Sequence, residues 1–202
     1  MIITIDGRCG MGKSTIGSLL AQRLGFVFLS SGLFIRAMAW EYRRRLDAGA
    51  PDDQALAEAI ESLSLDEMES IPLEQLRDDA LIPYMKTVNL DPRALEAANR
   101  LMRAFCAGRD VVVDGRDTFD IIPEADLTYY FESTQEKRAR LMEKTQGRPF
   151  DECLAHIKRR DAAERDVHVP YDRLIVIDPL DAPIEDTVAR MVEDVKRRGD
   201  RS

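Results

Sequence analysis

The first fifteen residues constrain the fold more than any other part of this chain. They form a short apolar run, residues 2–5, that leads into Gly7-x-x-x-x-Gly12-Lys13-Ser14. In such a loop the glycines let the backbone turn tightly, so that successive amide groups point at phosphate oxygens, and the lysine adds a positive charge for the outer phosphates. The serine hydroxyl can coordinate Mg²⁺. This pattern predicts a phosphate-binding P-loop.

The segment after the loop supports this interpretation. Residues 13–24 carry apolar side chains at helical spacing, Ile16, Leu19, Leu20 and Leu24. The N-terminus of that helix would face the bound phosphates with its partial positive charge. The alternative is a chance match to a loose motif, and the order of strand, loop and helix argues against it. The residues predicted to bind the phosphates are Gly7, Arg8, Cys9, Gly10, Met11, Gly12, Lys13, Ser14 and Thr15.

Composition limits the function classes. A chain of 202 residues can form one compact domain, and its net charge of −8 disfavours a nucleic-acid partner. Its three cysteines are widely spaced, which argues against both a disulfide framework and a metal site built from cysteines. No apolar run approaches the ~20 residues of a membrane span, and the chain opens on a strand and not on a leader. We therefore expect a cytoplasmic protein, a monomer or small homo-oligomer, with no membrane partner.

Four further apolar runs indicate strands that alternate with helical patterns. The runs are residues 26–29, 110–114, 127–131 and 174–177. Alternating strands and helices predict an α/β fold with a five-stranded parallel sheet. Between residues 52 and about 87 the chain turns acidic and rich in Leu and Ala, which favours short helices lying on the main body.

Asp114 is a second functional signal. It closes the β-branched run that should lie beside the P-loop strand, and Arg116 and Asp117 follow it. A carboxylate in that position can hold Mg²⁺, together with Ser14 of the loop. An ordinary strand-to-loop turn would also use Asp and Gly, but the accompanying P-loop favours a metal site at Ser14 and Asp114.

A charged helical hairpin is expected near the C-terminal end, broken at residues 147–149. Two interpretations stay open. The hairpin is either an exposed, salt-bridged helix pair or a lid that closes arginines over transferring phosphates. Phosphoryl transfer needs more positive charge than one lysine and one metal ion supply, which favours the lid. The arginines concerned are Arg138, Arg140, Arg148, Arg159, Arg160 and Arg165.

With these residues in view, the sequence resembles the cytidylate kinase family of nucleoside monophosphate kinases. Four stretches carry the likeness: residues 3–7 into the P-loop, residues 29–37, residues 114–117 with 123–126, and residues 160–165. The resemblance implies a single three-layer P-loop kinase domain with helices on both faces of the sheet. Its core would comprise residues 1–48, 108–145 and 170–202, its helical acceptor-binding insert about 49–107, and its lid about 146–169.

The resemblance also implies roles for individual residues and for ATP and Mg²⁺. Lys13 would act on the phosphates of ATP, and Arg160 and Arg165 would act as lid arginines. Arg116 and Asp117 would grip the acceptor during catalysis. The residues matched to acceptor binding are Ser31, Arg36, Arg93, Arg116, Asp117 and Glu164.

Several acceptor-side positions depart from the family pattern. The family has Asp where this chain has Ser30, Tyr where it has Ile35, and a further arginine where it has Val167. An arginine expected after Pro92 appears only as Arg93, two positions away. The donor side is intact, so the sequence favours an ATP-dependent phosphotransferase more strongly than it favours one particular acceptor.

Three functions remain possible at this point. The first is transfer of the γ-phosphate of Mg-ATP to a nucleoside monophosphate such as CMP, dCMP or a modified pyrimidine nucleotide. The second is a pathway-specific kinase that uses another small phosphorylated acceptor, such as a phosphonate, on the same scaffold. The third is a non-catalytic nucleotide-sensing module, against which the intact Lys13, Ser14 and Asp114 argue.

Overall fold

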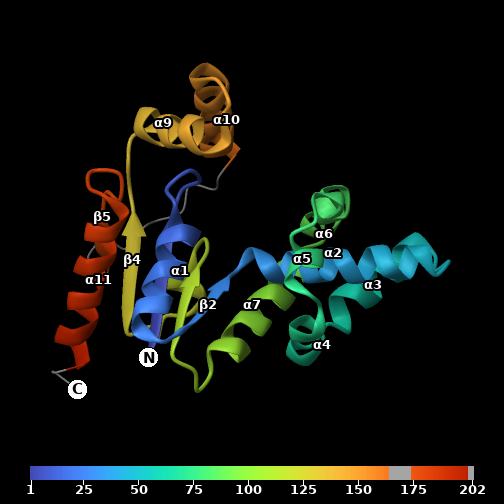
Figure 1. The fold of residues 1–202 in the computed structure, drawn as a ribbon. Coiled ribbons are helices and arrows are strands. Elements are labelled where there is room, and N and C mark those ends of the chain that lie inside the picture. Colours follow the sequence, from blue (N-terminus) through green and yellow to red (C-terminus); the bar gives the residue numbers. More distant parts are fainter. Residues whose placement is uncertain (164–173, 200–202) are drawn as a thin grey trace. The chain divides into compact units, whose positions relative to one another are not determined.

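The computed structural model describes residues 1–163 and 174–199. The chain divides into two compact units, which we treat separately (Figure 1). The phosphate-loop unit consists of Met1–Leu29 and Arg109–Ser202, and the helical unit consists of Ser30–Gly108. The expected insert at about 49–107 falls within the helical unit, which also contains the helix that follows residue 31 and that we had assigned to the core.

A parallel sheet forms the centre of the phosphate-loop unit. Its strands, among the described residues, are β1 (Ile2–Gly7), β2 (Val27–Ser30), β3 (Val111–Asp114), β4 (Leu127–Phe131) and β5 (Ile175–Ile177). They lie in the order β2-β3-β1-β4-β5, with β1 parallel to both β3 and β4. The expected five-stranded sheet is therefore confirmed, with the P-loop strand in the middle. Ile5 lies opposite Asp114, so the carboxyl ends of β1 and β3 meet at one edge.

Apolar residues of the sheet are buried beneath helices. The described helices of this unit are α1 (Lys13–Leu24), α8 (Thr118–Ile121), α9 (Gln135–Gln146), α10 (Phe150–Ala163) and α11 (Ile184–Gly199). Helices α1 and α11 contact each other, and the core joins their apolar faces to the central strands. Ile3, Ile5 and Phe131 are fully buried there, as are Leu20 of α1 and Val188 of α11. Burial of this kind supplies most of the driving force for folding.

The hairpin of α9 and α10 has its own small core. Thr134 caps α9 by accepting the Lys137 amide at 3.3 Å, and Gly147 ends the helix with φ 66°. The break at Gly147 agrees with the sequence analysis, since Gly favours left-handed helix ends, and Thr134 is typical of a helix start. The residues buried between the two helices are Ala139, Met142, Cys153 and Ile157.

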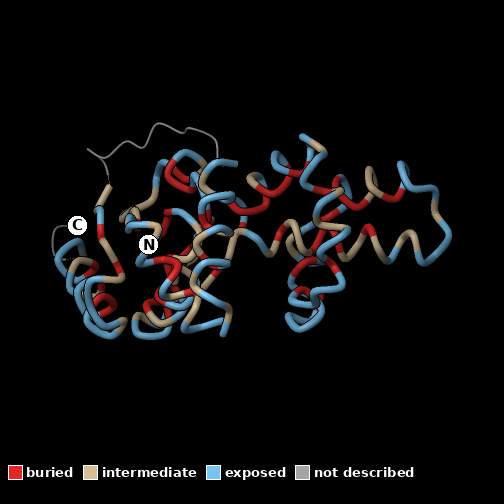
Figure 2. Tube along the Cα trace, turned by 90° about the horizontal axis from the view of Figure 1, so that it is seen from above, coloured by how far each residue is buried: buried red, intermediate tan, exposed pale blue. Residues whose placement is uncertain are grey.

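The helical unit contains only helices within residues 31–108. They are α2 (Gly32–Asp47), α3 (Asp52–Glu61), α4 (Leu65–Ser70), α5 (Leu73–Leu76), the 3₁₀ turn η1 (Asp79–Leu81), α6 (Ile82–Leu90) and α7 (Pro92–Cys106). Helix α7 begins at residues typical of a helix start, since Asp91 accepts the Arg93 amide at 2.9 Å and Pro92 opens the helix. Figure 2 shows buried positions alternating with exposed ones along the helices of both units. No helix in the described part of the chain is long and apolar enough to cross a membrane.

Candidate active site

The P-loop takes its shape from glycines in backbone conformations that other residues rarely adopt. Gly10 and Gly12 have φ of 77° and 73°, in the left-handed region, and Gly7 has φ 133°. A Cβ on Gly7 would lie 2.4 Å from the carbonyl oxygen of Phe131 on β4, closer than atoms can approach. Because Gly7 has no side chain, the backbone at the end of β1 can lie in close contact with the neighbouring strand β4. The loop therefore begins at the carboxyl end of β1 and leads directly into the N-terminus of α1.

Lys13 is held inside this loop. Its Nζ donates to the carbonyl oxygens of Gly7 and Arg8, at 2.5 and 2.9 Å. Burial lowers the pKa of Lys13 below its usual range, while the nearby charge of Asp114 opposes that shift. The ammonium group is thus kept beside the loop by backbone acceptors, where the oxygens of a bound phosphate can take their place.

Ser14 and Asp114 meet beside the loop. The Ser14 hydroxyl donates to Oδ2 of Asp114, and the Asp114 side chain is almost fully buried at the end of β3. Both are oxygen ligands of the kind Mg²⁺ prefers, and Mg²⁺ is often bound by one or two protein ligands that leave room for phosphates and waters. The described residues contain no group of three or more His, Cys, Asp or Glu that could hold a metal ion alone. The pair therefore fits Mg²⁺ bound with a phosphorylated ligand.

The turn that carries Arg116 and Asp117 is anchored by Asp6, a residue that our sequence analysis did not select. Asp6 is buried at the end of β1 and accepts the Thr118 amide and hydroxyl, at 3.0 and 2.5 Å, and the Phe119 amide at 3.0 Å. Burial raises the pKa of Asp6, and these hydrogen bonds oppose the rise. Asp117, with φ 56°, adopts a left-handed conformation that is rare for residues other than glycine. Arg116 and Asp117 are both exposed on this anchored turn.

Arg138 lies on the hairpin, as expected, but its side chain is buried. We had placed it among the charged residues of the hairpin, but its side chain is only 2% exposed and pairs with Asp161, whose side chain is 7% exposed. It also donates to the carbonyl oxygen of Cys9 in the P-loop, at 3.1 Å. The expectation of an exposed, salt-bridged surface is therefore wrong at Arg138. A basic residue on a charged helix is usually solvated, and its acidic partner is distant in sequence.

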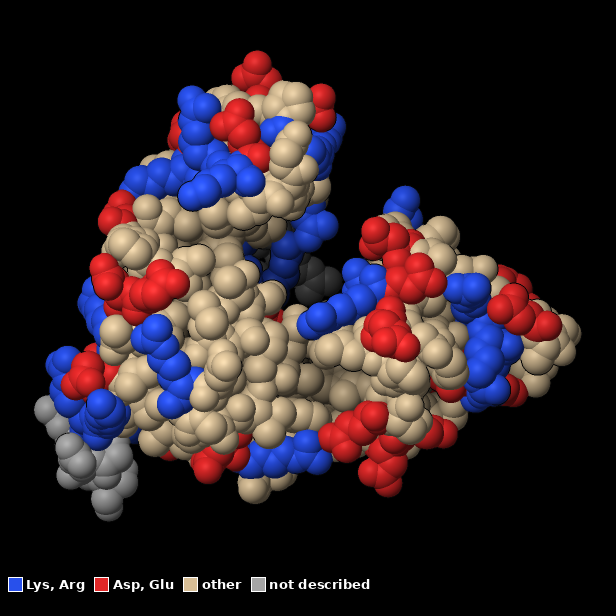
Figure 3. Space-filling view, viewed as in Figure 1, with Lys and Arg blue, Asp and Glu red and all other residues tan. Residues whose placement is uncertain are grey.

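The hairpin arginines assigned to a lid are only partly described. Arg160 is exposed near the end of α10, whereas Glu164 and Arg165 lie outside the described residues. Figure 3 shows basic side chains mixed with acidic ones on the surface of this hairpin. Ion pairs of Arg140 with Glu143 and of Arg148 with Glu152 account for part of that mixture.

The acceptor-side residues Ser31, Arg36 and Arg93 belong to the helical unit. Ser31 precedes α2, and Arg36 in its second turn donates to the carbonyl oxygen of Leu76, at 3.0 Å. Arg93 donates to Asp91 and to Glu61, each at 2.8 Å, and is exposed. Arg93 is thus engaged by two carboxylates of its own unit.

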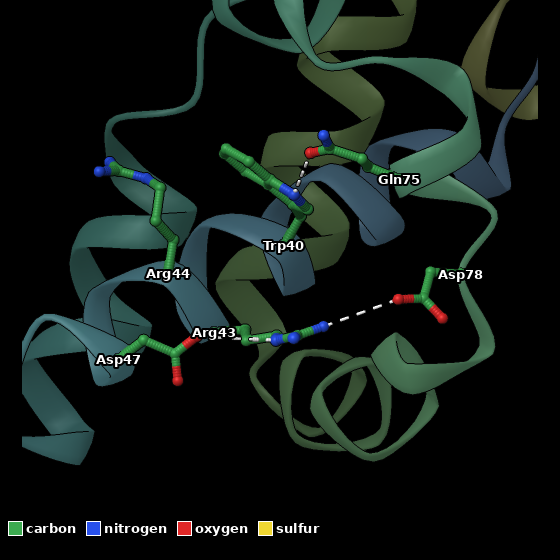
Figure 4. Close-up of a pocket in the computed structure, with 6 residues that line it drawn as sticks. All are labelled: Trp40, Arg43, Arg44, Asp47, Gln75 and Asp78. Carbon is green, nitrogen blue, oxygen red and sulfur yellow. Dashed lines mark hydrogen bonds and ion pairs between the residues drawn. The ribbon is translucent and has the colours of Figure 1, made fainter.

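A pocket of about 330 Å³ lies on the same helix as Arg36 (Figure 4). The indole of Trp40 donates to Oε1 of Gln75 at 3.0 Å, and Arg43 lies 3.7 Å from both Asp47 and Asp78. Arg43 thus faces two carboxylates of the pocket and Arg44 pairs with Glu41, so this pocket offers little attraction for a phosphate. The residues that line it are Trp40, Arg43, Arg44, Asp47, Gln75 and Asp78.

Comparison with known proteins decides among the families that use such a loop. The family model for cytidylate kinase matches residues 3–197. The chain belongs to the cytidylate kinase family. The resemblance inferred from the sequence is thereby confirmed, and membership of the cytidylate kinase family makes the chain a kinase.

Curated relatives match along nearly the whole chain. The cytidylate kinase of Mycoplasmopsis agalactiae is 32% identical over 219 residues, covering 97% of each chain. That of Vibrio cholerae is 30% identical over 218 residues, covering 98% of this chain and 96% of the relative. That of Caldanaerobacter subterraneus is 28% identical over 214 residues, covering 96% of this chain and 94% of the relative.

Solved structures agree with the fold. A shikimate kinase from Bacteroides thetaiotaomicron matches with a TM-score of 0.51 at 15% identity, covering 97% of this chain and 98% of that chain. An uncharacterised protein from Eubacterium ventriosum matches with a TM-score of 0.57 at 12% identity, covering 98% of each chain. At these identities the likeness is one of fold alone. It confirms the predicted three-layer α/β P-loop kinase fold for this member of the cytidylate kinase family.

Proposed function

We propose that the protein transfers the γ-phosphate of Mg-ATP to a nucleoside monophosphate, of which CMP, dCMP or a modified pyrimidine nucleotide is the preferred acceptor. One observation carries the proposal. Lys13, Ser14 and Asp114 are brought together around the P-loop of a chain that belongs to the cytidylate kinase family. The names of the curated relatives support the choice of a pyrimidine acceptor.

The loop residues bind and orient the donor. Backbone amides from Gly7 to Thr15 surround the phosphates, and the N-terminus of α1 adds its partial positive charge. Lys13 exchanges the carbonyls of Gly7 and Arg8 for phosphate oxygens and stabilises the negative charge that spreads over them during transfer. Ser14 and Asp114 would hold Mg²⁺, which neutralises phosphate charge when bound.

Within the helical unit, Ser31, Arg36 and Arg93 are assigned to acceptor binding. Within the phosphate-loop unit, Arg116 and Asp117, on the turn that Asp6 anchors, have the same assignment. Positive groups that align the acceptor oxygen with the phosphoryl group lower the barrier mainly by orientation. The lid residues Arg160, Glu164 and Arg165 close over the site and exclude water, so that transfer is faster than hydrolysis.

The substrate is tested by measuring ADP release with a panel of nucleoside monophosphates. We expect turnover with CMP or dCMP and much less with purine monophosphates. A Lys13→Met variant is the control, because it keeps the fold of the loop but loses the charge on the outer phosphates. Absence of turnover with every pyrimidine monophosphate would remove the proposal.

A second candidate is transfer to another small phosphorylated acceptor, such as a phosphonate. The observation that favours it lies on the acceptor side. Arg93 is paired with Asp91 and Glu61, and Ser30 and Ile35 stand where the family has Asp and Tyr. Turnover with such an acceptor, and none with nucleotides, would select this candidate. Binding of ATP without transfer to any acceptor would instead indicate a nucleotide-sensing module.

A further inference from the structure

The outer side of the P-loop rests on the α9–α10 hairpin. A Cβ built on Gly10 would lie 3.4 Å from Cβ of Arg138 and 3.6 Å from Cδ1 of Ile157. Cys9 packs against the small core that joins α9 to α10. The hairpin is therefore in van der Waals contact with the loop. A shift of either helix would displace residues 9 and 10.

Arg138 also connects the P-loop and the α9–α10 hairpin through hydrogen bonds. Its Nη1 donates to the carbonyl oxygen of Cys9 at 3.1 Å and to Oδ1 of Asp161 at 3.0 Å, and its Nη2 donates to Oδ2 of Asp161 at 2.5 Å. The planar guanidinium holds its donors in a fixed fork, which can pair with both oxygens of a carboxylate and still donate to a carbonyl, whereas an ammonium group lacks this fixed geometry. The three bonds join α9, α10 and the loop at a single side chain.

Asp161 gathers further donors at the same place. Gln135 donates to its Oδ2 at 2.8 Å, and Nη1 of Arg8 in the P-loop lies 3.5 Å from the same oxygen. Burial alone would raise the pKa of Asp161, but the hydrogen bonds from Arg138 and Gln135 and the charges of Arg138 and Arg8 hold it below its usual range. The carboxylate therefore stays ionised at neutral pH, with donors from the loop on one side and from α9 on the other.

This arrangement determines where one loop amide points. In a planar trans peptide the carbonyl and the following amide point in opposite directions. Because the Cys9 carbonyl is directed at Arg138, the Gly10 amide is directed away from the hairpin, as a donor to a phosphate must be. An apolar contact could pack this interface equally well, since a buried ion pair is seldom more stabilising than apolar side chains of similar size.

From these contacts we infer that Arg138 and Asp161 are positioning residues for the triphosphate of ATP. They hold the peptide between Cys9 and Gly10 in its binding orientation and tie it to α10, the helix that carries Arg160. Loss of the pair weakens the binding of ATP and leaves binding of the acceptor unchanged. This inference rests on the proposed use of ATP as donor and goes beyond it by assigning residues outside the P-loop to donor affinity.

Two single variants and their combination separate positioning from simple stability. Arg138→Met or Asp161→Leu alone leaves one buried charge unpaired, and we expect a large drop in the temperature of unfolding. The double variant Arg138→Met/Asp161→Leu removes both charges and should recover most of that drop. Its affinity for ATP, measured by calorimetry without acceptor, should remain weaker than wild type by about tenfold or more, the effect of a lost hydrogen bond to a charged donor. The KM for the acceptor should not change.

Two further variants serve as controls for the role of Arg138. Lys137→Met alters an exposed residue of the same helix, paired with Asp178 and Asp181 at the surface, and should leave ATP affinity at the wild-type value. Arg138→Lys keeps the buried charge but cannot reach both partners, so it should fold and still bind ATP more weakly. Wild-type affinity for ATP in Arg138→Lys or in the double variant would overturn the inference. Normal ATP binding by the wild-type protein without phosphorylation of any acceptor would refute only the proposed function.

Discussion

At the scale of single residues, the environment of a charge determines its behaviour, and the ammonium group of Lys13 shows this. Burial lowers its pKa, whereas phosphate oxygens would favour its charged form. Lys13 of the free protein therefore loses its proton at a lower pH than an ordinary lysine, whose pKa is about 10.4. A bound triphosphate should raise the pKa of Lys13 again.

We predict that ATP binding takes up protons at alkaline pH. Between the lowered pKa of free Lys13 and its higher value in the complex, binding adds a proton, so affinity for ATP should fall as the pH rises through this window. Calorimetry in two buffers of different ionisation enthalpy measures the uptake. Lys13→Arg is the matched control, because arginine stays charged and should show no such uptake. Equal uptake in both proteins would assign the proton to another group.

The buried carboxylate of Asp6 leads to a second prediction. Replacing it with alanine leaves the amides of Thr118 and Phe119 buried without their acceptor, and we expect a loss of stability of about 1–3 kcal/mol. The turnover rate should also fall, because Arg116 and Asp117 lie on the turn that Asp6 holds.

A matched change at the other end of the strand gives the comparison for Asp6. Asp126 accepts the Ile2 amide at 2.7 Å at an exposed position, so Asp126→Ala should cost less stability and leave turnover unchanged. Denaturant unfolding and steady-state kinetics measure the two effects. Similar losses in both variants would contradict the special role of Asp6.

The pair of Arg138 and Asp161 could not be predicted from the sequence. Both residues occur on helices rich in charge, where solvated side chains and local ion pairs are the usual outcome. Their burial follows from the way α10 folds back on α9 beneath the P-loop, and that contact joins residues 23 positions apart in sequence. Roles that arise from such tertiary contacts leave no local pattern in the chain.

At the scale of elements, local sequence signals were sufficient to predict several strands and helices. Strand β4, helix α1 and the start of α7 at Asp91 and Pro92 follow from apolar runs, helical spacing and capping residues that act over a few neighbours. The P-loop could be recognised for the same reason, since its glycines serve a backbone shape that only glycine allows. The membership of helix α2 in the helical unit depends on packing against α3, α6 and α7, which no local signal reveals.

The join between β1 and the loop provides a prediction at this scale. Gly7→Ala would place a Cβ 2.4 Å from the Phe131 carbonyl oxygen, so we expect ATP binding to be lost and stability to fall well beyond the usual cost of alanine at a glycine site. Gly25→Ala is the control, because Gly25 has φ 72° and nothing lies within 4 Å of its Cβ position. That variant should lose only about 1–2 kcal/mol, from backbone conformation alone. Equal losses would show that the contact with β4 is unimportant.

At the scale of the whole molecule, the phosphate-loop unit carries the P-loop, and the helical unit carries Arg36, which we propose binds the acceptor. The helical unit offers its own reporter, because Trp40 is the only tryptophan of the chain. Arg36 donates to Leu76 on α5, and the adjacent Gln75 accepts from the Trp40 indole. A phosphate that binds Arg36 should therefore displace α5 and alter the surroundings of Trp40.

We predict that titration with a pyrimidine monophosphate changes the emission of Trp40. The corresponding nucleoside, which lacks the phosphate, should leave the emission unchanged, and so should the monophosphate added to Arg36→Met. A response of equal size to the nucleoside would show that the helical unit senses the base and not the phosphate.

The most direct test of the account is to follow the γ-phosphate itself. ATP labelled at that position is mixed with CMP and the protein, and the nucleotide products are separated. The account predicts that the label appears in CDP with the wild-type protein and that Lys13→Met reduces the rate of transfer by orders of magnitude. A label that stays in ATP, or is released as inorganic phosphate whichever pyrimidine monophosphate is present, would contradict it.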